Sequence, residues 1–213
     1  MSGTREEKKR KTKKAILSAA VELFGKYGFE KTSIAQLART AGVGKGTVYS
    51  YFKTKQDILQ AFCDDELEFI HERLTSESDT SKNILDQMVT IFLAEFTYVT
   101  RNPEFGRIYM QESVFPRKQL LTSHNESENR YFEMIFPVIK NAQDRGELRE
   151  DLELLHICGH FFALYLLVLH SWYTDLLKTE EAEEALRTLF TQIIHGLQPL
   201  SKTPTETRHP HEL

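Results

Sequence analysis

The sequence predicts an all-α protein with about nine helices, and two observations lead to that prediction. Apolar residues recur at helical spacing along almost the whole chain, and no group of neighbouring segments shows the alternating, β-branched pattern of strands. The 213 residues are 40% hydrophobic and 27% charged, which is typical of a globular protein that buries a core. A chain of this length holds one compact unit or two small ones.

The first helix is expected over residues 12–27. Its other face is rich in lysine, and Gly28 can end it in a left-handed conformation. The apolar positions that share one face of this helix are Ile16, Ala20, Leu23, Phe24 and Tyr27.

Two short helices follow the first. Ser33 and Gln36 form a capping-box pattern, which predicts the start of a second helix that ends at Gly42. After a tight turn, residues 43–52 are expected to form the third helix.

Long helices fill the next part of the chain. Thr54 and Asp57 give a second cap pattern, ahead of a helix that continues to about residue 74. A polar, serine-rich break over residues 75–81 separates it from a helix expected over residues 82–101.

Prolines and glycines mark the later boundaries. Asn102 and Pro103 supply an N-cap and a first-turn proline, and Pro116 marks the next break. A long helix then continues to Gly146, with a kink expected at Pro137 because its ring excludes one backbone hydrogen bond.

The last two helices carry the longest apolar stretches. Asp151 is expected to cap the penultimate helix, which is apolar nearly all round over residues 161–169 and therefore needs cover on more than one side. A partner subunit is the expected cover. Residues 201–213 lack periodicity and are expected to form a mobile tail. The stripe of the last helix consists of Ala182, Ala185, Leu186, Leu189, Phe190, Ile193, Ile194 and Leu197.

Charge is divided unevenly along the chain. Residues 1–60 contain 13 Lys or Arg against 5 Asp or Glu, whereas residues 61–213 contain 14 against 26. A basic end joined to an acidic end is expected when one part contacts a polyanion and the other part has a different task.

Several classes of protein are disfavoured by the sequence. The longest uninterrupted apolar run is residues 161–169, which is too short to span a membrane. The basic first fourteen residues are not followed by a signal-type apolar block, so the protein is expected in the cytoplasm. Cys63 and Cys158 stand in helix-like apolar contexts that fit reduced thiols better than a disulfide.

Residues 32–52 place two short helices about a glycine turn, which is the layout of a helix-turn-helix. Its apolar side is expected to pack on the first helix, leaving a polar and aromatic side exposed. Lysines and hydroxyls supply phosphate donors, and Gly46 allows the backbone to approach a duplex closely. The exposed side consists of Lys45, Thr47, Tyr49, Ser50 and Tyr51.

At these residues the sequence resembles the TetR family of transcriptional regulators. The resemblance covers roughly thirty residues. It implies a homodimer that binds a palindromic DNA operator through its N-terminal helices. The larger C-terminal helical domain would bind a small effector and dimerise through its last two helices. The matching residues are Gly28, Phe29, Thr32, Ser33, Ile34, Leu37, Ala38, Ala41, Gly42, Val43, Lys45, Gly46, Thr47, Val48, Tyr49, Tyr51, Phe52, Lys55, Ile58 and Leu59.

The resemblance also implies roles for single residues. Ser33 is expected to cap its helix and contact a phosphate, while Tyr49, Tyr51 and Lys55 are expected to clamp the DNA backbone. Gly44 stands where the family often has Ser or Ala, so no hydroxyl contact is assumed there. The complete expected DNA-binding set is Thr32, Ser33, Gly44, Lys45, Gly46, Thr47, Tyr49, Ser50, Tyr51 and Lys55.

The domain organisation expected from these observations has three parts. Residues 1–53 form a DNA-binding helix-turn-helix domain, residues 54–200 an effector-binding and dimerisation domain, and residues 201–213 the tail. The function that follows is a ligand-responsive regulator, and more specifically a repressor, that leaves its operator when an apolar or amphipathic effector binds.

Aromatic side chains on several helices of the second domain are expected to surround that effector, although each also suits a packed core. The expected pocket residues are Phe92, Phe96, Tyr109, Phe132, Phe136, Phe161, Tyr165 and Trp172. The expected dimer interface consists of Leu164, Val168, Leu186, Phe190, Ile193, Ile194 and Leu197.

Two other functions remain alternatives. Residues 42–47 resemble the glycine-rich loop of phosphotransferases, but such a loop must follow a β-strand, whereas residues 33–40 have a helical pattern. The second alternative is a helical adaptor that binds no nucleic acid. Such a protein would still form the dimer but would show no preference for one DNA duplex over another.

Catalysis and metal binding are not indicated. His156 and His160 are spaced to share one helix face, but no third ligand is evident, so packing or solvent-facing histidines are the better interpretation. No arrangement of serine, cysteine or carboxylate residues points to an active site. The chain is therefore expected to have no enzymatic activity, no cofactor and no membrane partner.

Overall fold

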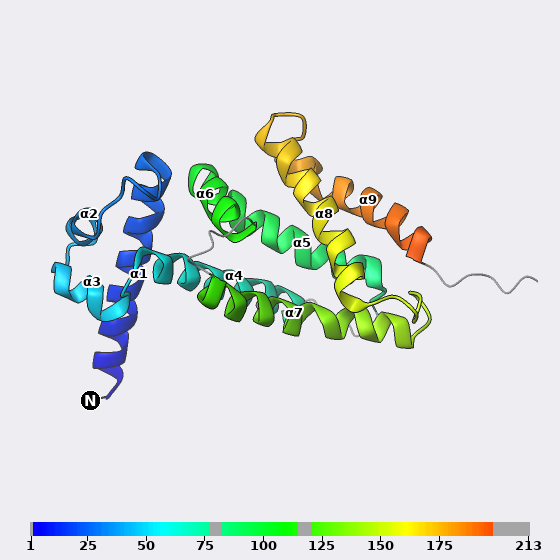
Figure 1. The fold of residues 1–213 in the computed structure, drawn as a ribbon, viewed down its shortest axis with the longest axis horizontal. Coiled ribbons are helices and arrows are strands. Elements are labelled where there is room, and N and C mark those ends of the chain that lie inside the picture. The colour runs from blue at the N-terminus through cyan, green and yellow to red at the C-terminus, as the bar shows by residue number, and fades with distance from the viewer. Residues whose placement is uncertain (1, 77–81, 115–120, 198–213) are drawn as a thin grey trace, which may run out of the picture.

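The computed structural model describes residues 2–76, 82–114 and 121–197, and in these ranges it is all-helical, as the sequence predicts (Figure 1). A single 3-10 turn, η2 (Thr179–Glu181), precedes the last helix. The nine α-helices of the described ranges are α1 (Ser2–Tyr27), α2 (Ile34–Thr40), α3 (Lys45–Tyr51), α4 (Lys55–Ser76), α5 (Ile84–Thr100), α6 (Pro103–Val114), α7 (Leu121–Asp144), α8 (Leu154–Tyr173) and α9 (Ala182–Leu197).

The first three helices form a small bundle at one end of the molecule. Helix α2 packs on α1 and α3 packs on α2, as the blue and cyan ribbons of Figure 1 show. Ile16 and Phe24 of α1 are fully buried, and so are Leu37 of α2 and Val48 of α3. These positions belong to the apolar faces that the helical spacing predicts, because burying a single stripe from each helix is the way a three-helix bundle obtains a core.

Helix α5 is the centre of the larger helical part. It lies between the pair α4 and α7 on one side and the pair α8 and α9 on the other, and it also packs on α6 (Figure 1). Because these neighbours surround it, residues on almost every side of α5 are buried, including Met88, Ile91 and Phe96. Buried residues of the bundle and of this larger part form one continuous apolar cluster.

Side-chain caps hold the starts of α5 and α6, and the cap at Asn102 is one that the sequence predicts. Asn83 caps α5 by accepting a hydrogen bond from the N–H of Asp86, and Asn102 accepts one from the N–H of Phe105 with Pro103 in the first turn of α6. Gly146 has φ +74° just after α7, where a left-handed residue ends a helix favourably.

Two expected boundaries differ from the structure, and three other expected features lie wholly or mostly outside the described residues. Helix α1 begins at Ser2 rather than near residue 12. Glu153 occupies the N-cap position of α8 and makes no side-chain cap bond there, so the prediction that Asp151 caps this helix is wrong. The Asp151 carboxylate instead accepts a hydrogen bond from the Arg149 guanidinium at 2.6 Å. Residues 77–81, 115–120 and 198–213 lie outside the described residues, and with them most of the predicted serine-rich break, Pro116 and the predicted tail. Helix α7 continues across Pro137.

Helix α8 is the most apolar of the long helices. By length and composition alone it would be able to cross a membrane, with a mean hydropathy of 1.6 over an 18-residue window, of which 33% is buried in the chain. The core helix of a soluble protein meets the same criterion, and α8 does pack against α5, α7 and α9. One side of it stays uncovered, where Leu155 and Leu167 are 52% and 49% exposed.

Candidate nucleic-acid interface

The turn between α1 and α2 is closed by backbone and hydroxyl hydrogen bonds. Gly28, at φ +83°, donates its N–H to Phe24 O, and the Thr32 hydroxyl interacts with the carbonyl oxygens of Leu23 at 3.1 Å and Gly28 at 2.9 Å. Thr32 is only 1% exposed. Its buried side chain therefore stabilises the turn. Because it is buried, the Thr32 side chain does not reach DNA, contrary to expectation.

Helix α2 begins with the capping box that the sequence predicts. Ser33 Oγ accepts from the N–H of Gln36, and Gln36 Oε1 accepts from the N–H of Ser33 at 2.8 Å. These reciprocal bonds satisfy two backbone donors that a helix start otherwise leaves open. Ser33 remains exposed, so its position at the first turn of α2 is open to a phosphate.

The turn between α2 and α3 depends on one left-handed glycine. Gly42 has φ +66°, and the next residue, Val43, donates its N–H to Ala38 O at 2.9 Å. Gly44 is the N-cap of α3 with an extended backbone and φ −70°, and no side chain caps the helix. A Cβ at Gly44 would meet Thr47 Oγ1 at an ordinary 3.6 Å, so the missing hydroxyl at this position is not imposed by lack of space.

Helix α3 exposes one side and buries the other. Val48 is fully buried against the bundle, while Lys45, Gly46, Tyr49 and Ser50 are exposed. At 100° per residue these four positions occupy a single continuous arc. Four residues of the expected DNA-binding set thus lie together on the free surface of one helix. Thr47 and Tyr51 lie beyond Ser50 on the way round the helix to Val48, and both are half-buried.

Two of the predicted polar residues also have internal partners. Ser50 Oγ donates to Thr47 O at 2.7 Å, within α3. Lys55 Nζ donates to Phe29 O at 2.6 Å and Glu30 O at 3.2 Å, and it lies 4.6 Å from the centre of the Phe29 ring. Lys55 therefore joins the first turn of α4 to the loop before α2, a structural contact that the sequence does not reveal.

The first turns of α1 concentrate positive charge beside this surface. Residues 5–14 carry seven lysines or arginines, all of them exposed, and Ile16 is the first fully buried residue of the helix. An ion pair between Lys11 and Glu7 at 2.8 Å offsets part of this charge. In Figure 1 the N-terminal turns of α1 continue past α3, so they extend the cationic surface beyond the two short helices.

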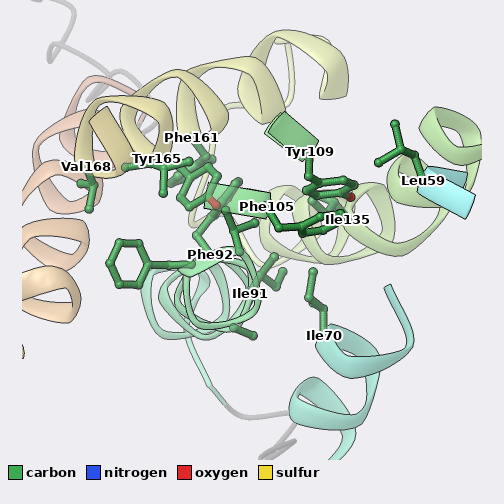
Figure 2. Close-up of a cluster of buried hydrophobic side chains, with 14 of the residues drawn as sticks. Leu59, Ile70, Ile91, Phe92, Phe105, Tyr109, Ile135, Phe161, Tyr165 and Val168 are labelled. Carbon is green, nitrogen blue, oxygen red and sulfur yellow. The ribbon is translucent and has the colours of Figure 1, made fainter. Parts of the chain in front are cut away.

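The predicted pocket residues fall into separate groups. Phe92, Phe161 and Tyr165, labelled in Figure 2, are fully buried, and the ring centres of Phe92 and Tyr165 lie 5.3 Å apart. Phe96, also buried, contacts Trp172 edge to face at 5.8 Å. These side chains form packed core between α5 and α8.

The remaining predicted pocket residues lie on α6 and α7. Phe132 and Phe136 are half-buried and stack at 4.9 Å on α7. Tyr109 of α6 is buried, and it is the one member of the predicted set that lines a cavity of about 170 Å³ between α1, α4, α5 and α6. That all eight aromatic residues surround one effector pocket remains a prediction.

A buried carboxylate in the larger helical part was not foreseen. Glu95 of α5 is 5% exposed, and its Oε2 lies 3.5 Å from the Tyr131 hydroxyl of α7. Burial, together with the negative charge of Glu95, raises the pKa of the Cys158 thiol to about 12, so this cysteine stays protonated and unreactive at neutral pH. The sequence feature that could have revealed this buried carboxylate is the position of Glu95 within the apolar stripe of Ile91, Phe92 and Phe96.

Most of the predicted dimer-interface residues are buried in the core of the chain itself. Leu186 and Phe190 of α9 are fully buried, and the Phe190 ring meets Phe92 and Phe161. The structure therefore places these two residues in the core rather than at a subunit interface, because the centre of the α9 stripe faces α5 and α8. Val168 and Ile194 are buried as well, at 2% and 8% exposed, and Leu164 and Ile193 are half-buried. The side chain of Leu197 lies outside the described part of the chain.

An uncovered stripe of α8 was missed by the sequence interpretation. Leu155, Gly159, Ala163 and Leu167 are all exposed and follow one another at intervals of four, so they share one face. Small residues in the middle of such a stripe allow another helix to approach closely.

The alternative functions find no geometry to support them. The glycine-rich run follows helix α2 rather than a β-strand, which a phosphate-binding loop requires. His156 is exposed and lies 3.8 Å from Glu153. Within the described ranges, no group of three or more His, Cys, Asp or Glu side chains is placed to hold a metal ion.

Comparisons with known proteins agree with this arrangement. Residues 16–62 match the sequence profile described as bacterial regulatory proteins, tetR family. The chain is 23% identical over 139 residues to the fatty acid metabolism regulator protein of Bacillus subtilis, covering 65% of this chain and 72% of that one.

Two solved structures share the fold. The fatty acid degradation regulator FadR from Bacillus halodurans superposes with a TM-score of 0.73 at 18% identity, over 87% of this chain and 99% of that one. FadR from Bacillus subtilis in complex with stearoyl-CoA gives 0.70 at 22% identity, over 82% and 96%. With the helix-turn-helix and its matching residues in place, residues 16–62 belong to the tetR family of bacterial regulatory proteins.

Proposed function

We propose that this protein is a cytoplasmic, ligand-responsive transcriptional repressor that binds a palindromic DNA operator as a homodimer. The observation that carries the proposal is the exposed arc of Lys45, Gly46, Tyr49 and Ser50 on α3, opposite the buried Val48. A short helix exposed in this way, at the second position of a helix-turn-helix, is suited to a major groove. Lys45 and Ser50 offer donors to bases and phosphates.

DNA binding and effector binding are proposed to belong to different helical parts of the chain. We assign residues 1–53 to DNA binding and residues 54–200 to effector binding and dimerisation; the predicted tail, 201–213, lies outside the described residues. Of the DNA-binding set we retain Ser33, the four arc residues, and Thr47 and Tyr51 beside the arc. Gly44 is retained only as a site of close backbone approach, and Lys55 and Thr32 are assigned to the fold.

Dimerisation is proposed through the uncovered side of α8. The stripe of Leu155, Gly159, Ala163 and Leu167 would meet its own copy across a two-fold axis, with the outer edge of α9, including Ile193, beside it. A two-fold axis suits a palindromic operator, because two α3 helices about 34 Å apart enter successive major grooves on one side of the duplex.

The effector is proposed to be an amphipathic compound with an acyl chain. The similarity to a fatty acid metabolism regulator and to a structure holding stearoyl-CoA supports this class. The half-buried pair Phe132 and Phe136 on α7 is the part of the predicted pocket set that remains available to such a chain without opening the core. The effector would act by binding more tightly to the form that does not hold DNA.

The experiment is selection of bound duplexes from a random pool by the full-length protein, followed by fluorescence anisotropy with the selected operator. We expect a palindromic sequence, and an affinity that falls when acyl-CoA thioesters of increasing chain length are added. Failure of every duplex to bind at low ionic strength would overturn the proposal. Operator affinity unchanged by the whole acyl series would overturn the effector class.

Salt dependence gives a further prediction. If the dimer neutralises roughly 8 phosphates, the logarithm of the binding constant should fall with the logarithm of the salt concentration at a slope near −7. The exposed cations of residues 5–14 contribute to this slope without regard to sequence. Anisotropy titrations at several salt concentrations measure it, and a flat response would contradict a phosphate-based interface.

A further inference from the structure

The cavity of about 170 Å³ lies where the DNA-binding bundle meets the larger helical part. Helix α1 contributes Val21, α4 contributes Phe62 and Asp65, and the rest of the wall comes from α5, α6 and the corner between them. Figure 2 shows Phe105 and Tyr109 of α6 side by side, away from the cluster of Phe92, Phe161 and Tyr165. The cavity, called here the junction pocket, is therefore separate from the packed aromatic core of α5 and α8.

Four of the ten residues that line the junction pocket are aromatic. Phe62, Tyr98, Phe105 and Tyr109 supply ring surfaces, and the Phe62 and Phe105 centres are 4.5 Å apart. An apolar cavity of roughly 150 Å³ holds one benzene molecule, so this volume suits a ligand about the size of a single ring with a short substituent.

Asp65, Arg101 and Asn102 are polar residues that line the junction pocket, and Asp65 supplies its carboxylate. Asp65 Oδ2 accepts a hydrogen bond from the Tyr98 hydroxyl at 3.0 Å, which orients the group, and a carboxylate has room for further donors. Asp65 is exposed, so a ligand reaches it without displacing the core. Arg101 also lines the pocket, but its guanidinium lies over the rings of Phe69 and Tyr98, at 4.3 and 5.2 Å.

The wall of the junction pocket packs directly against the DNA-binding bundle. Phe105 stacks on Phe24 of α1 at 6.4 Å, and Phe24 contacts Phe29, on whose ring Lys55 lies. At Gly25, a Cβ would already lie 3.4 Å from Asn102 Oδ1, so α1 and the start of α6 have little space between them.

Helix α6 is held equally closely on its other side. Any side chain at Gly106 would collide with the carbonyl oxygen of Val99 on α5. The Tyr173 hydroxyl of α8 donates to Pro103 O at 2.9 Å, at the first turn of α6. Because α6 is confined between α1 and α5, a molecule inserted beside it must favour some positions of α1 over others.

We propose that the junction pocket is a second regulatory site, which binds a compact aromatic compound carrying an ammonium group. The ring would fill the space between Phe62, Phe105 and Tyr109, and the ammonium would pair with Asp65. Aromatic walls and a carboxylate both favour a cation, and the acidic charge of residues 61–213 adds to that preference. The regulatory part rests on the proposed DNA-binding function; the binding part does not.

The test uses three probes of one shape with the full-length protein: benzylamine, benzyl alcohol and benzoate. Ligand-observed NMR and calorimetry should show benzylamine binding with a dissociation constant on the order of 1 mM, tighter than the alcohol and far tighter than benzoate. The isosteric Asp65→Asn should weaken benzylamine about tenfold and leave benzyl alcohol unchanged. Val21→Phe, which fills the pocket from α1, should weaken both.

Matched controls separate the carboxylate from general charge. Asp144→Asn, an exposed carboxylate at the end of α7, should leave benzylamine binding unchanged. Absence of benzylamine binding to the wild type, equal binding by Asp65→Asn, or preference for benzoate would each overturn the site. Since Asp65 is exposed, its variant should fold normally even if Val21→Phe does not.

Regulation is tested with the selected operator. Saturating benzylamine should change operator affinity roughly 5- to 150-fold, and operator should change benzylamine affinity by the same factor, because coupling is reciprocal. Binding of the amine with operator affinity unchanged would overturn the regulatory role. If no duplex binds in the absence of any amine, the proposed DNA function fails while the NMR result still decides the ligand site.

Discussion

Gly46 is a residue at which stability and function are expected to oppose each other. It lies in α3 with helical backbone, and a Cβ added there would have no neighbouring atom within 4 Å, so alanine fits without a clash. Gly46→Ala should raise the free energy of unfolding by up to about 1 kcal/mol, since glycine is the poorer helix former. Operator affinity should fall, because the methyl group stands between α3 and the duplex. Urea unfolding and anisotropy measure the two effects.

The matched control is Gly196→Ala in α9, where a Cβ also meets nothing within 4 Å. It should not change operator affinity. Unchanged DNA binding by Gly46→Ala would contradict the close approach of α3 to a duplex.

Lys55 is expected to stabilise the fold rather than read DNA. Lys55→Met keeps much of the side-chain length but removes the hydrogen bonds to Phe29 O and Glu30 O, which should cost about 1–2 kcal/mol of unfolding free energy. Lys53→Met, an exposed neighbour, should change stability little. Equal unfolding midpoints for the two variants in urea would refute the structural role of Lys55.

At the scale of elements, the start of α4 joins the DNA-binding bundle to the effector domain and is held by a capping box. Asp57 Oδ2 accepts from the N–H of Lys53 at 2.8 Å and of Thr54 at 3.2 Å, and Thr54 Oγ1 accepts from the N–H of Asp57 at 3.1 Å. Partial burial raises the pKa of Asp57, but these bonds, the Thr54 hydroxyl bond and the charge of Lys53 outweigh it, so the pKa lies below its usual value.

This lowered pKa predicts an acid-dependent contribution to stability. A carboxyl with a lower pKa in the folded state stabilises the fold fully above its unfolded pKa of about 3.9 and loses that stabilisation as the pH falls through the folded value. Asp57→Asn should therefore be less stable than wild type at neutral pH, by about 0.5–1 kcal/mol, and equal to it in strong acid. Urea unfolding across this range measures the difference, and a gap that persists in acid would refute the assignment.

At the scale of the whole molecule, the uncovered stripe of α8 predicts the subunit interface. Leu167→Arg would place a charge within an apolar contact between two copies, where burial without a partner is costly. We expect this variant to be monomeric by light scattering, folded by circular dichroism, and weak in operator binding. Asn141→Arg on α7, also exposed, should remain dimeric. A dimeric Leu167→Arg would exclude this face.

Local features of the fold could be predicted from the sequence because their partners are a few residues apart. Ser33 acts with Gln36 and Thr54 with Asp57 within one turn of chain, and Gly28 takes its predicted left-handed conformation just after α1. The same reasoning failed for Asp151, where a neighbouring arginine competes for the carboxylate. Helical spacing likewise determined that Val48 is buried and that Lys45 and Tyr49 are exposed, because one apolar stripe leaves only one free side on a short helix.

Only the tertiary structure decided which apolar surface faces which neighbour. Helical spacing shows that Phe190 and Leu167 are both apolar positions, yet Phe190 is buried on α5 and α8 whereas Leu167 is exposed. Lys55 bonds to the loop before α2, which is far from it in the chain. The junction pocket likewise brings together Val21, Asp65 and Phe105, which are distant in sequence. Hydrophobic burial is non-directional, so a periodic pattern specifies that a face must be covered, and only the packing of all helices specifies by what.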